Sequence, residues 1–237
     1  MKYLDLTLPS PAANLACDEA LLEACEDCPE GEVLRFWEPR EYFVVLGYAN
    51  RAESEVNLAA CRQANIGVYR RCSGGGTVLQ GPGCLNYSLV LNVAEHPALQ
   101  GTATATRHIM ARQRQALAGV LGRAVCVAGT SDLALDGRKF SGNAQRHKRA
   151  ALIFHGTFLL NFDLSLMEQF LPMPSRQPDY RLGRPHGQFL ANLGVPAALV
   201  KLGLREAWSA AEIWEVPPVI PPRLRQKYAG REWNMKF

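Results

Sequence analysis

The feature that most constrains the fold is the dipeptide Asp136-Gly137, which lies between two short runs of strand-like composition. A type I′ turn needs positive φ at both central residues, and Asp-Gly is one of the few pairs that accept it. The flanking segments, residues 131–135 and 138–145, are short enough to be single strands. The sequence therefore predicts a β-hairpin, and with it an antiparallel strand pair, at this point of the chain.

The remaining segments alternate between strand-like and helix-like patterns, read from the spacing of apolar residues and from turn residues. We expect strands at residues 31–39, 41–49, 67–72, 84–93, 123–129 and 151–162, and helices at residues 11–25, 54–66, 102–121, 165–171, 186–193 and 196–208. Strands joined by hairpins, with helices between some of them, favour an α/β (α+β) fold whose mixed, largely antiparallel sheet is flanked by helices. Residues 1–237 are expected to form a single domain, with residues 221–237 as an ordered tail packed on it.

Composition and charge narrow the class of protein. Hydrophobic residues make up 48% of the chain and charged residues 20%, as in globular proteins with a substantial core. The formal net charge of +4 is too mild to indicate a nucleic-acid partner, but it suits an anionic ligand or an acidic partner. No apolar run approaches a membrane span and the N-terminus lacks the apolar core of a signal peptide, so we expect a cytoplasmic protein without a membrane partner.

The first segment that can carry chemistry is Arg-Arg-Cys-Ser-Gly-Gly-Gly-Thr, residues 70–77. Three consecutive glycines let the backbone approach a ligand closely and point N–H groups at it. The two preceding arginines add fixed positive charge, so the segment is a candidate cradle for a phosphate or a carboxylate. A flexible turn is the alternative. The segment is neither a Walker loop nor a Rossmann fingerprint, because no Gly-Lys-Ser/Thr follows and the glycine spacing differs.

The second such segment is the hairpin itself, where Lys139 stands two residues after the turn, between Arg138 and Phe140. A lysine in this position is either a solvated turn charge or a cation that the strand holds over a negative group. A strand-borne ammonium suits a reaction in which negative charge develops at a carbonyl or a phosphate. The hairpin alone leaves both interpretations open.

Three motifs in one order carry a family resemblance: "RRCSGGGTVLQGPG" at residues 70–83, "DLALDGRKFSGNAQRHK" at 132–148, and "HGTFLLNFDL" at 155–164. Together they resemble the lipoate–protein ligase A family, within the wider group of biotin and lipoyl ligases and octanoyl transferases. The resemblance extends from "NLACDEALL" near the N-terminus to "KYAGREWN" near the C-terminus. It implies a domain similar to the catalytic domains of class II aminoacyl-tRNA synthetases and biotin ligases, without the C-terminal accessory domain of larger ligases.

The resemblance also implies an activity. Family ligases join lipoate to ATP, which gives lipoyl-AMP and pyrophosphate, and then transfer the lipoyl group to a lysine of a lipoyl carrier domain or a GcvH-like carrier protein. ATP and Mg²⁺ are the implied cofactors, with lipoate as substrate and a separate accessory-domain subunit as a possible partner. On the matching positions, the resemblance implies that Lys139 is catalytic and also contacts lipoate. Lipoate binding is implied for Arg70, Ser73, His155 and Gly156, and metal binding for Asp132. The residues implied to bind the nucleotide are Arg71, Gly74, Gly75, Gly76, Thr77, Val78, Leu79 and Asp132.

Several positions leave alternatives open. Cys84 stands where well-known ligases have an asparagine, which puts the local nucleotide contact in question. Arg70 could instead be structural, paired with a carboxylate behind the loop. Octanoyl transferases share the fold and the lysine but carry the acyl group on a cysteine, without ATP. The cysteine available upstream of the hairpin is Cys126, whose apolar neighbours favour a buried strand residue. A non-catalytic lipoate-binding module is the third possibility.

Overall fold

The strand pairing confirms the expected mixed, largely antiparallel sheet. The computed structural model describes residues 1–94, 96–215 and 218–237. Its strands are β1 (Lys2–Asp5), β2 (Val33–Trp37), β3 (Phe43–Leu46), β4 (Gly67–Arg70), β5 (Val78–Gln80), β6 (Cys84–Asn92), β7 (Cys126–Ala128), β8 (Asp132–Leu135), β9 (Arg138–His147), β10 (Ala151–Leu159) and β11 (Glu212–Ile213). Within these residues the main sheet has the order β11-β1-β2-β6-β10-β9-β8-β7, and a smaller sheet has the order β4-β3-β5. The parallel pairs are β1 with β2, β1 with β11, and β3 with β4.

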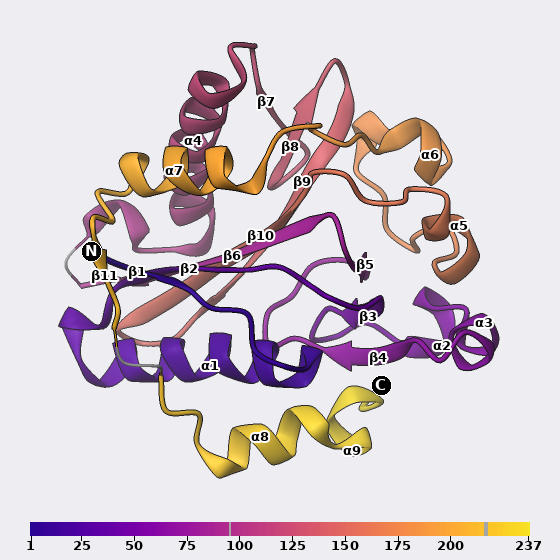
Figure 1. The fold of residues 1–237 in the computed structure, drawn as a ribbon, viewed down its shortest axis with the longest axis horizontal. Helices are drawn as coiled ribbons and strands as arrows, with labels where there is room; N and C mark the ends of the chain where they lie inside the picture. The colour runs from indigo at the N-terminus through magenta and orange to yellow at the C-terminus, as the bar shows by residue number, and fades with distance from the viewer. Residues whose placement is uncertain (95, 216–217) are drawn as a thin grey trace.

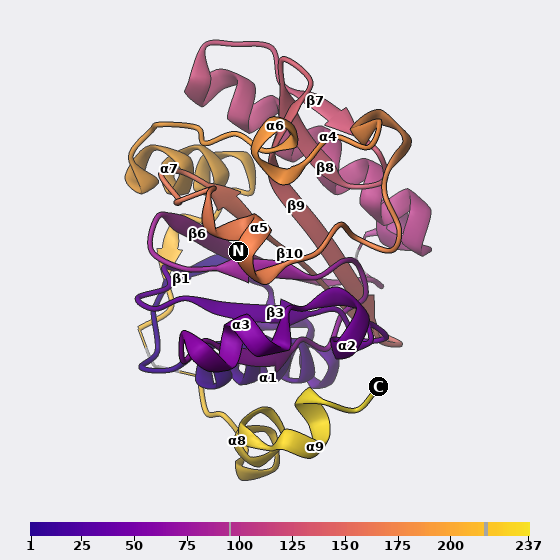
Figure 2. The ribbon, with the colours of Figure 1, turned by 90° about the vertical axis from the view of Figure 1, so that its right-hand side faces the viewer.

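Helices cover both faces of the main sheet. They are α1 (Pro11–Asp27), α2 (Ala52–Glu55), α3 (Leu58–Gln63), α4 (Thr102–Leu121), α5 (Leu166–Phe170), α6 (His186–Phe189), α7 (Ala197–Ala207), α8 (Pro222–Ala229) and α9 (Arg231–Asn234). Figure 1 shows α4 and α7 on one side of the sheet and α1, backed by α8, on the other. The short helices α2 and α3 lie beside the smaller sheet (Figure 2). None of the helices in the described residues has the length and apolarity to cross a bilayer.

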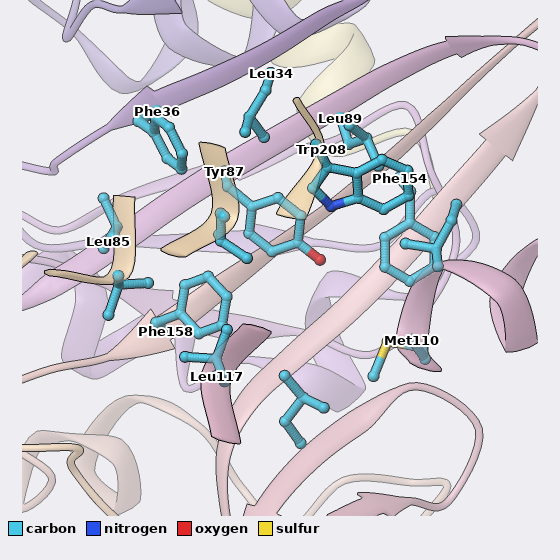
Figure 3. Packing of buried hydrophobic residues seen from close by; sticks show 14 of the residues in the cluster. Leu34, Phe36, Leu85, Tyr87, Leu89, Met110, Leu117, Phe154, Phe158 and Trp208 are labelled. Atoms are coloured by element: carbon cyan, nitrogen blue, oxygen red, sulfur yellow. The ribbon is translucent and has the colours of Figure 1, made fainter. Parts of the chain in front are cut away.

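The alternation of side chains along the central strands builds a core on each face. In β2, Leu34 and Phe36 pack toward α4 and α7, whereas Val33 and Trp37 pack toward α1. Tyr87 follows the same rule in β6 and lies with Phe36 in the first cluster (Figure 3). Because both faces are covered, the central strands read as nearly continuous apolar runs in the sequence.

A buried ion pair interrupts the apolar core on the α1 face. Arg35 of β2 is fully buried, and its Nη1 donates to Oδ1 of Asp18 in α1 at 2.5 Å. The same guanidinium donates to the carbonyl and the side-chain amide oxygen of Asn14 and to the carbonyl of Leu6. Charge and hydrogen bonds therefore join the N-terminal turns of α1 to the middle of the sheet.

Most expected elements are present, although the helix expected at residues 186–193 ends at Phe189. The helix expected at residues 54–66 is divided, because Val56 adopts an extended conformation and Asn57 caps α3 by accepting from the N–H of Ala60. The hairpin turn is as predicted, with φ of 50° at Asp136 and 73° at Gly137. The expected ordered tail contains α8 and α9, and Tyr228 in α8 is fully buried.

Loss of the Asp18 carboxylate should be costly. Removing one member of a buried ion pair leaves the other charge unpaired, so Asp18→Ala should lower the free energy of unfolding by about 3–5 kcal/mol. Asp5→Ala is the matched control, because Asp5 pairs with Lys201 but is about half exposed. An exposed pair contributes about 0–1 kcal/mol. Urea unfolding of both variants measures the difference, and equal losses would contradict a special role for the buried pair.

Candidate active site

A row of side chains crosses the main sheet on the face covered by α1. Arg35 of β2 is opposite Ser88 of β6, and Ser88 is in turn opposite His155 of β10. His155 is opposite Ala144 of β9. Directly opposed residues of antiparallel strands share a face, so these side chains lie in one line. The glycine loop, residues 74–76, lies over the end of this line, since a Cβ added to Gly75 would be 3.4 Å from the Cβ of Ala144.

Lys139 lies on the same face, further along β9. Its Nζ is 2.8 Å from Oδ1 of Asp132 on β8, and Oδ2 of Asp132 accepts from the hydroxyl of Tyr180 at 2.8 Å. A Cβ on Gly142 would stand 2.8 Å from the Nζ of Lys139, so the lysine stem occupies the space that this glycine leaves. The Lys139 side chain is 24% exposed. It is a held cation with access to solvent rather than a free turn charge.

Ser73, His155 and Asp18 form a chain of polar contacts beneath the loop. Ser73 Oγ is 2.5 Å from Nε2 of His155, and Nδ1 of His155 is 3.7 Å from Oδ2 of Asp18. Burial acts to raise the pKa of Asp18, but the Arg35 charge and the His155 contact outweigh it and lower that pKa below its usual value. Asp18 is therefore ionised and orients the imidazole toward Ser73.

Arg71 holds the glycine loop in shape. Its Nη2 donates to the carbonyls of Gly74 and Gly76, and its Nε donates to Ser73 Oγ at 3.1 Å. Burial lowers the pKa of Arg71 to about 10, which leaves the guanidinium charged at neutral pH. These donors contact the protein's own loop, so the guanidinium of Arg71 fixes the shape of that loop.

The three glycines differ in what they do. Gly75 has φ of +86°, a conformation that L side chains rarely adopt, so the turn itself requires it. A Cβ on Gly74 or Gly76 would meet no heavy atom within 4 Å. The space over these two glycines is therefore open.

Arg70 lies behind the loop and is fully buried. Its guanidinium donates to backbone carbonyls, those of Gly47, Tyr48, Asn50, Trp233 and Asn234. This arrangement favours the structural alternative, although its partners are carbonyls rather than the carboxylate that the sequence suggested. Arg70 fastens the C-terminal tail to the strand that leads into the loop.

The other sequence-predicted positions divide between the loop and the core. Thr77 follows the loop and donates to Oδ1 of Asn50 at 3.2 Å, and Val78 begins β5. Leu79 is 1% exposed and packs in the cluster of the smaller sheet. Gly156 leaves room for the amide of Asn143 on the face opposite His155, where an added Cβ would be 1.9 Å from Asn143 Oδ1. Leu79 and Gly156 thus reach the site through backbone or packing alone.

The cysteines correct one expectation. Cys126 does lie in a strand, but it is exposed, so the prediction of a buried residue is wrong. The reason is that β7 is the edge strand of the main sheet, which leaves it uncovered on one side. Cys126 pairs with Ala134, and Ala134 with Lys139, so the Cys126 side chain is on the Lys139 face, and the backbones of β7 and β9 are two strand spacings, about 10 Å, apart. Cys84 is buried, and burial raises its pKa to about 12.

Asp132 offers little to a metal ion in this arrangement. Mg²⁺ prefers oxygen ligands and is usually bound by one or two carboxylates together with phosphates. Both oxygens of Asp132 are engaged, one by Lys139 and one by Tyr180. In the described part of the chain no group of three or more acidic, histidine or cysteine residues is arranged to hold a metal. A magnesium ion here would have to displace one of these two partners.

The structure therefore brings together the glycine loop, Ser73, His155 and the Lys139–Asp132 pair. Sequence reasoning missed two contributors, Asp18 and Tyr180. A carboxylate within the apolar stripe "NLACDEALL" was the available signal for Asp18. Tyr180 lies about 48 residues from Asp132 in a segment without motif, so only the fold identifies it.

Known proteins similar to this chain include enzymes with two different names. A curated relative, octanoyltransferase LipM of Brevibacillus brevis, is 27% identical over 99% of this chain and 98% of its own length. A probable lipoate-protein ligase A of Mycoplasma pneumoniae is 30% identical over 72% of this chain and 49% of that protein. Both are what the chain is similar to, and their names give two different activities.

Solved structures show the same fold. A bi-partite lipoate protein ligase of Thermoplasma acidophilum superposes with a TM-score of 0.79 at 23% identity, covering 99% of this chain and 95% of that one. A lipoate-protein ligase A bound with ATP gives a TM-score of 0.76, also at 23% identity, with 99% of each chain covered. The family model for the lipoyl protein ligase A/B catalytic domain matches residues 10–187. The chain therefore belongs to the lipoyl protein ligase A/B catalytic domain family.

Proposed function

We propose that this protein transfers an octanoyl group from the thioester of an acyl carrier protein to a lysine of a lipoyl carrier domain, through an acyl-thioester on Cys126. The observation that carries the proposal is the exposure of Cys126 on the sheet face that holds the Lys139–Asp132 pair. Similarity to octanoyltransferases over nearly the whole chain supports it. The sequence had favoured an ATP-dependent ligase, and these comparisons fit the transferase alternative better.

The proposed chemistry has two balanced steps. The Cys126 thiolate attacks the donor thioester carbonyl, a new C–S bond forms, and the carrier thiolate leaves with the proton that Cys126 lost. The acceptor lysine amine then attacks the acyl-Cys126 carbonyl, an amide forms, and the Cys126 sulfur leaves and regains a proton. Each step passes through a tetrahedral oxyanion. The Lys139 ammonium is held on this face by Asp132 and would stabilise that charge.

The residues under the loop would receive the acyl chain and the carbonyl. Ser73 and His155 are fixed by their mutual hydrogen bond and would line the acyl site. The open space over Gly74 and Gly76 would admit the reacting carbonyl beside Lys139, with loop N–H groups as additional donors. In this proposal Asp132 and Tyr180 act on the reaction by fixing the position of Lys139.

ATP-dependent lipoate ligation is the second candidate. The same open space over the glycines could instead hold the α-phosphate of an adenylate, with Lys139 on the same face of the sheet. In that case loop N–H groups from Gly74 to Thr77 would contact the nucleotide, Lys139 would bridge carbonyl and phosphate, and Mg²⁺ would arrive with ATP. A separate accessory subunit belongs to this candidate, because one similar ligase is bi-partite. A non-catalytic lipoate-binding module would need neither Lys139 nor Cys126.

The first prediction separates these functions. Purified protein, octanoyl-acyl carrier protein and an apo-lipoyl domain should yield an octanoylated domain without ATP, measured by intact mass. Lipoate, ATP and Mg²⁺ should produce no lipoate-dependent AMP release. AMP release with no use of the octanoyl thioester would replace the transferase with the ligase, and inactivity in both assays would favour the binding module.

The second prediction concerns the nucleophile. Cys126→Ala should abolish octanoyl transfer, because Cys126 is the exposed thiol that strand pairing places on the Lys139 face of the sheet. Mass spectrometry of wild-type protein with donor alone should find an octanoyl adduct on Cys126. Cys28→Ala is the matched control, since Cys28 is exposed just beyond the end of α1. Transfer within a few-fold of wild type in Cys126→Ala would exclude this cysteine as the acyl carrier.

The third prediction concerns the cation. Lys139→Ala should slow acyl transfer by about 10²- to 10³-fold, the scale expected when a preorganised donor to a developing charge is lost. Lys139→Arg should restore little of the transfer rate. The planar guanidinium group tends to pair bidentately with a carboxylate such as Asp132, and it cannot replace the compact charge of an ammonium group. Lys201→Ala, which removes another paired lysine, should leave the rate unchanged. The melting temperature of each variant reports whether the fold survives.

A wild-type rate in Lys139→Ala, with the fold intact, would return this residue to the class of solvated turn charges. A loss confined to the melting temperature would assign it to stability instead.

A further inference from the structure

A groove lies between α4 and the edge strand β7, on the face of the sheet opposite Lys139. Its volume is about 700 Å³, and its walls include Thr106, Arg107, Met110, Arg114, Val127 and Gln145. Val127 is 40% exposed, and its partner in the ladder, Leu133, belongs to the core on the α4 side. The exposed Val127 therefore gives the groove an apolar wall at the edge strand β7, which lies near α4 in Figure 1.

The rim of this groove is positively charged. Helix α4 has twenty residues and contains three arginines but no aspartate or glutamate. Arg107 and Arg114 are exposed and form no ion pair within the described part of the chain, whereas Arg112 stacks on Trp208 at 4.6 Å. Unpaired arginines beside an exposed apolar strip suit an acidic protein surface with a hydrophobic contact at its centre.

The proposed nucleophile is next in sequence to a residue that lines the groove. Cys126 and Val127 are consecutive residues of β7, and consecutive side chains of a strand point to opposite faces. Val127 therefore lines the groove while Cys126 is on the Lys139 face. Because β7 is the edge strand, the main sheet has no further strand beyond it, and a flexible group can pass around this edge from one face to the other.

We propose that this groove docks the acidic acyl carrier protein that donates the octanoyl group. The proposal rests on the proposed function. A protein seated in the groove leaves the Lys139 face open and must deliver its acyl group around the edge strand. A thioester on a long flexible arm can do so, whereas the acceptor lysine is short and its domain must lie against the Lys139 face itself. The groove thus fits the donor rather than the acceptor.

The test reverses the charge of the rim. Arg107→Glu/Arg114→Glu should lower kcat/KM for octanoyl-acyl carrier protein by about tenfold or more and flatten its dependence on salt, since electrostatic steering is lost. With octanoyl-N-acetylcysteamine, a small thioester that needs no docking, the rate should stay at the wild-type value. Arg107→Lys/Arg114→Lys should retain carrier activity. Arg62→Glu/Arg231→Glu makes the same charge change at exposed positions elsewhere and is the control.

Binding measured directly keeps this test separate from catalysis. Fluorescently labelled octanoyl-acyl carrier protein should bind the wild type and the control in a saturable, salt-sensitive manner and should not bind the reversed variant. Unchanged binding and kinetics in the reversed variant would overturn the proposal. So would an equal loss with both thioesters, or a raised KM for the lipoyl domain alone, which would assign the groove to the acceptor. If wild type uses neither thioester the proposed function fails, and the binding result still decides the docking site.

Discussion

The buried pair of Arg35 and Asp18 is the interaction on which the rest of the site depends. Two charges taken out of water are costly unless they face each other with good geometry and additional hydrogen bonds. Here the guanidinium of Arg35 on β2 contacts both α1 and the N-terminal segment, so one buried charge links those three parts. The second oxygen of Asp18 faces His155, which in turn contacts Ser73 at the glycine loop. The charge that fixes helix to sheet therefore also sets the position of the loop.

A second set of contacts fixes the position of Lys139 near the edge of the main sheet. Lys139, Asp132 and Tyr180 come from β9, β8 and a segment after β10, and they meet because the hairpin folds β8 against β9. The Lys139–Asp132 ion pair is only partly buried, so its contribution to stability is modest. Its main effect is to hold the ammonium group in one position. An ammonium held by one carboxylate keeps its position while two of its three protons remain available to a substrate oxygen. Such a group suits an acyl transfer whose transition state carries negative oxygen.

The sequence allowed local features to be predicted better than long-range ones. Asp136-Gly137 specified its turn because few residue pairs accept two positive φ angles, and α4 was placed at residues 102–121 by apolar spacing alone. Residues whose role depends on distant partners were less accessible. In the sequence, Arg70 stands beside glycines and suggests a ligand-binding residue. In the structure its guanidinium donates hydrogen bonds to backbone carbonyls more than 160 residues away. Cys126 reads as buried because its neighbours are apolar, but exposure depends on strand order, and β7 lies at the edge.

The scaffold explains how one family can hold both a ligase and a transferase. Both reactions bring an acyl carbonyl to a lysine amine and develop negative charge on oxygen beside a fixed cation, so under the proposed function both would use Lys139 and the glycine loop. They differ in what activates the acyl group: a phosphate needs free donors around the loop, and a thioester needs a reachable thiol. In this chain the donors of Arg70 and Arg71 are directed at the protein's own carbonyls, while Cys126 is exposed on the edge strand. That distribution of free groups, rather than the fold, favours thioester chemistry.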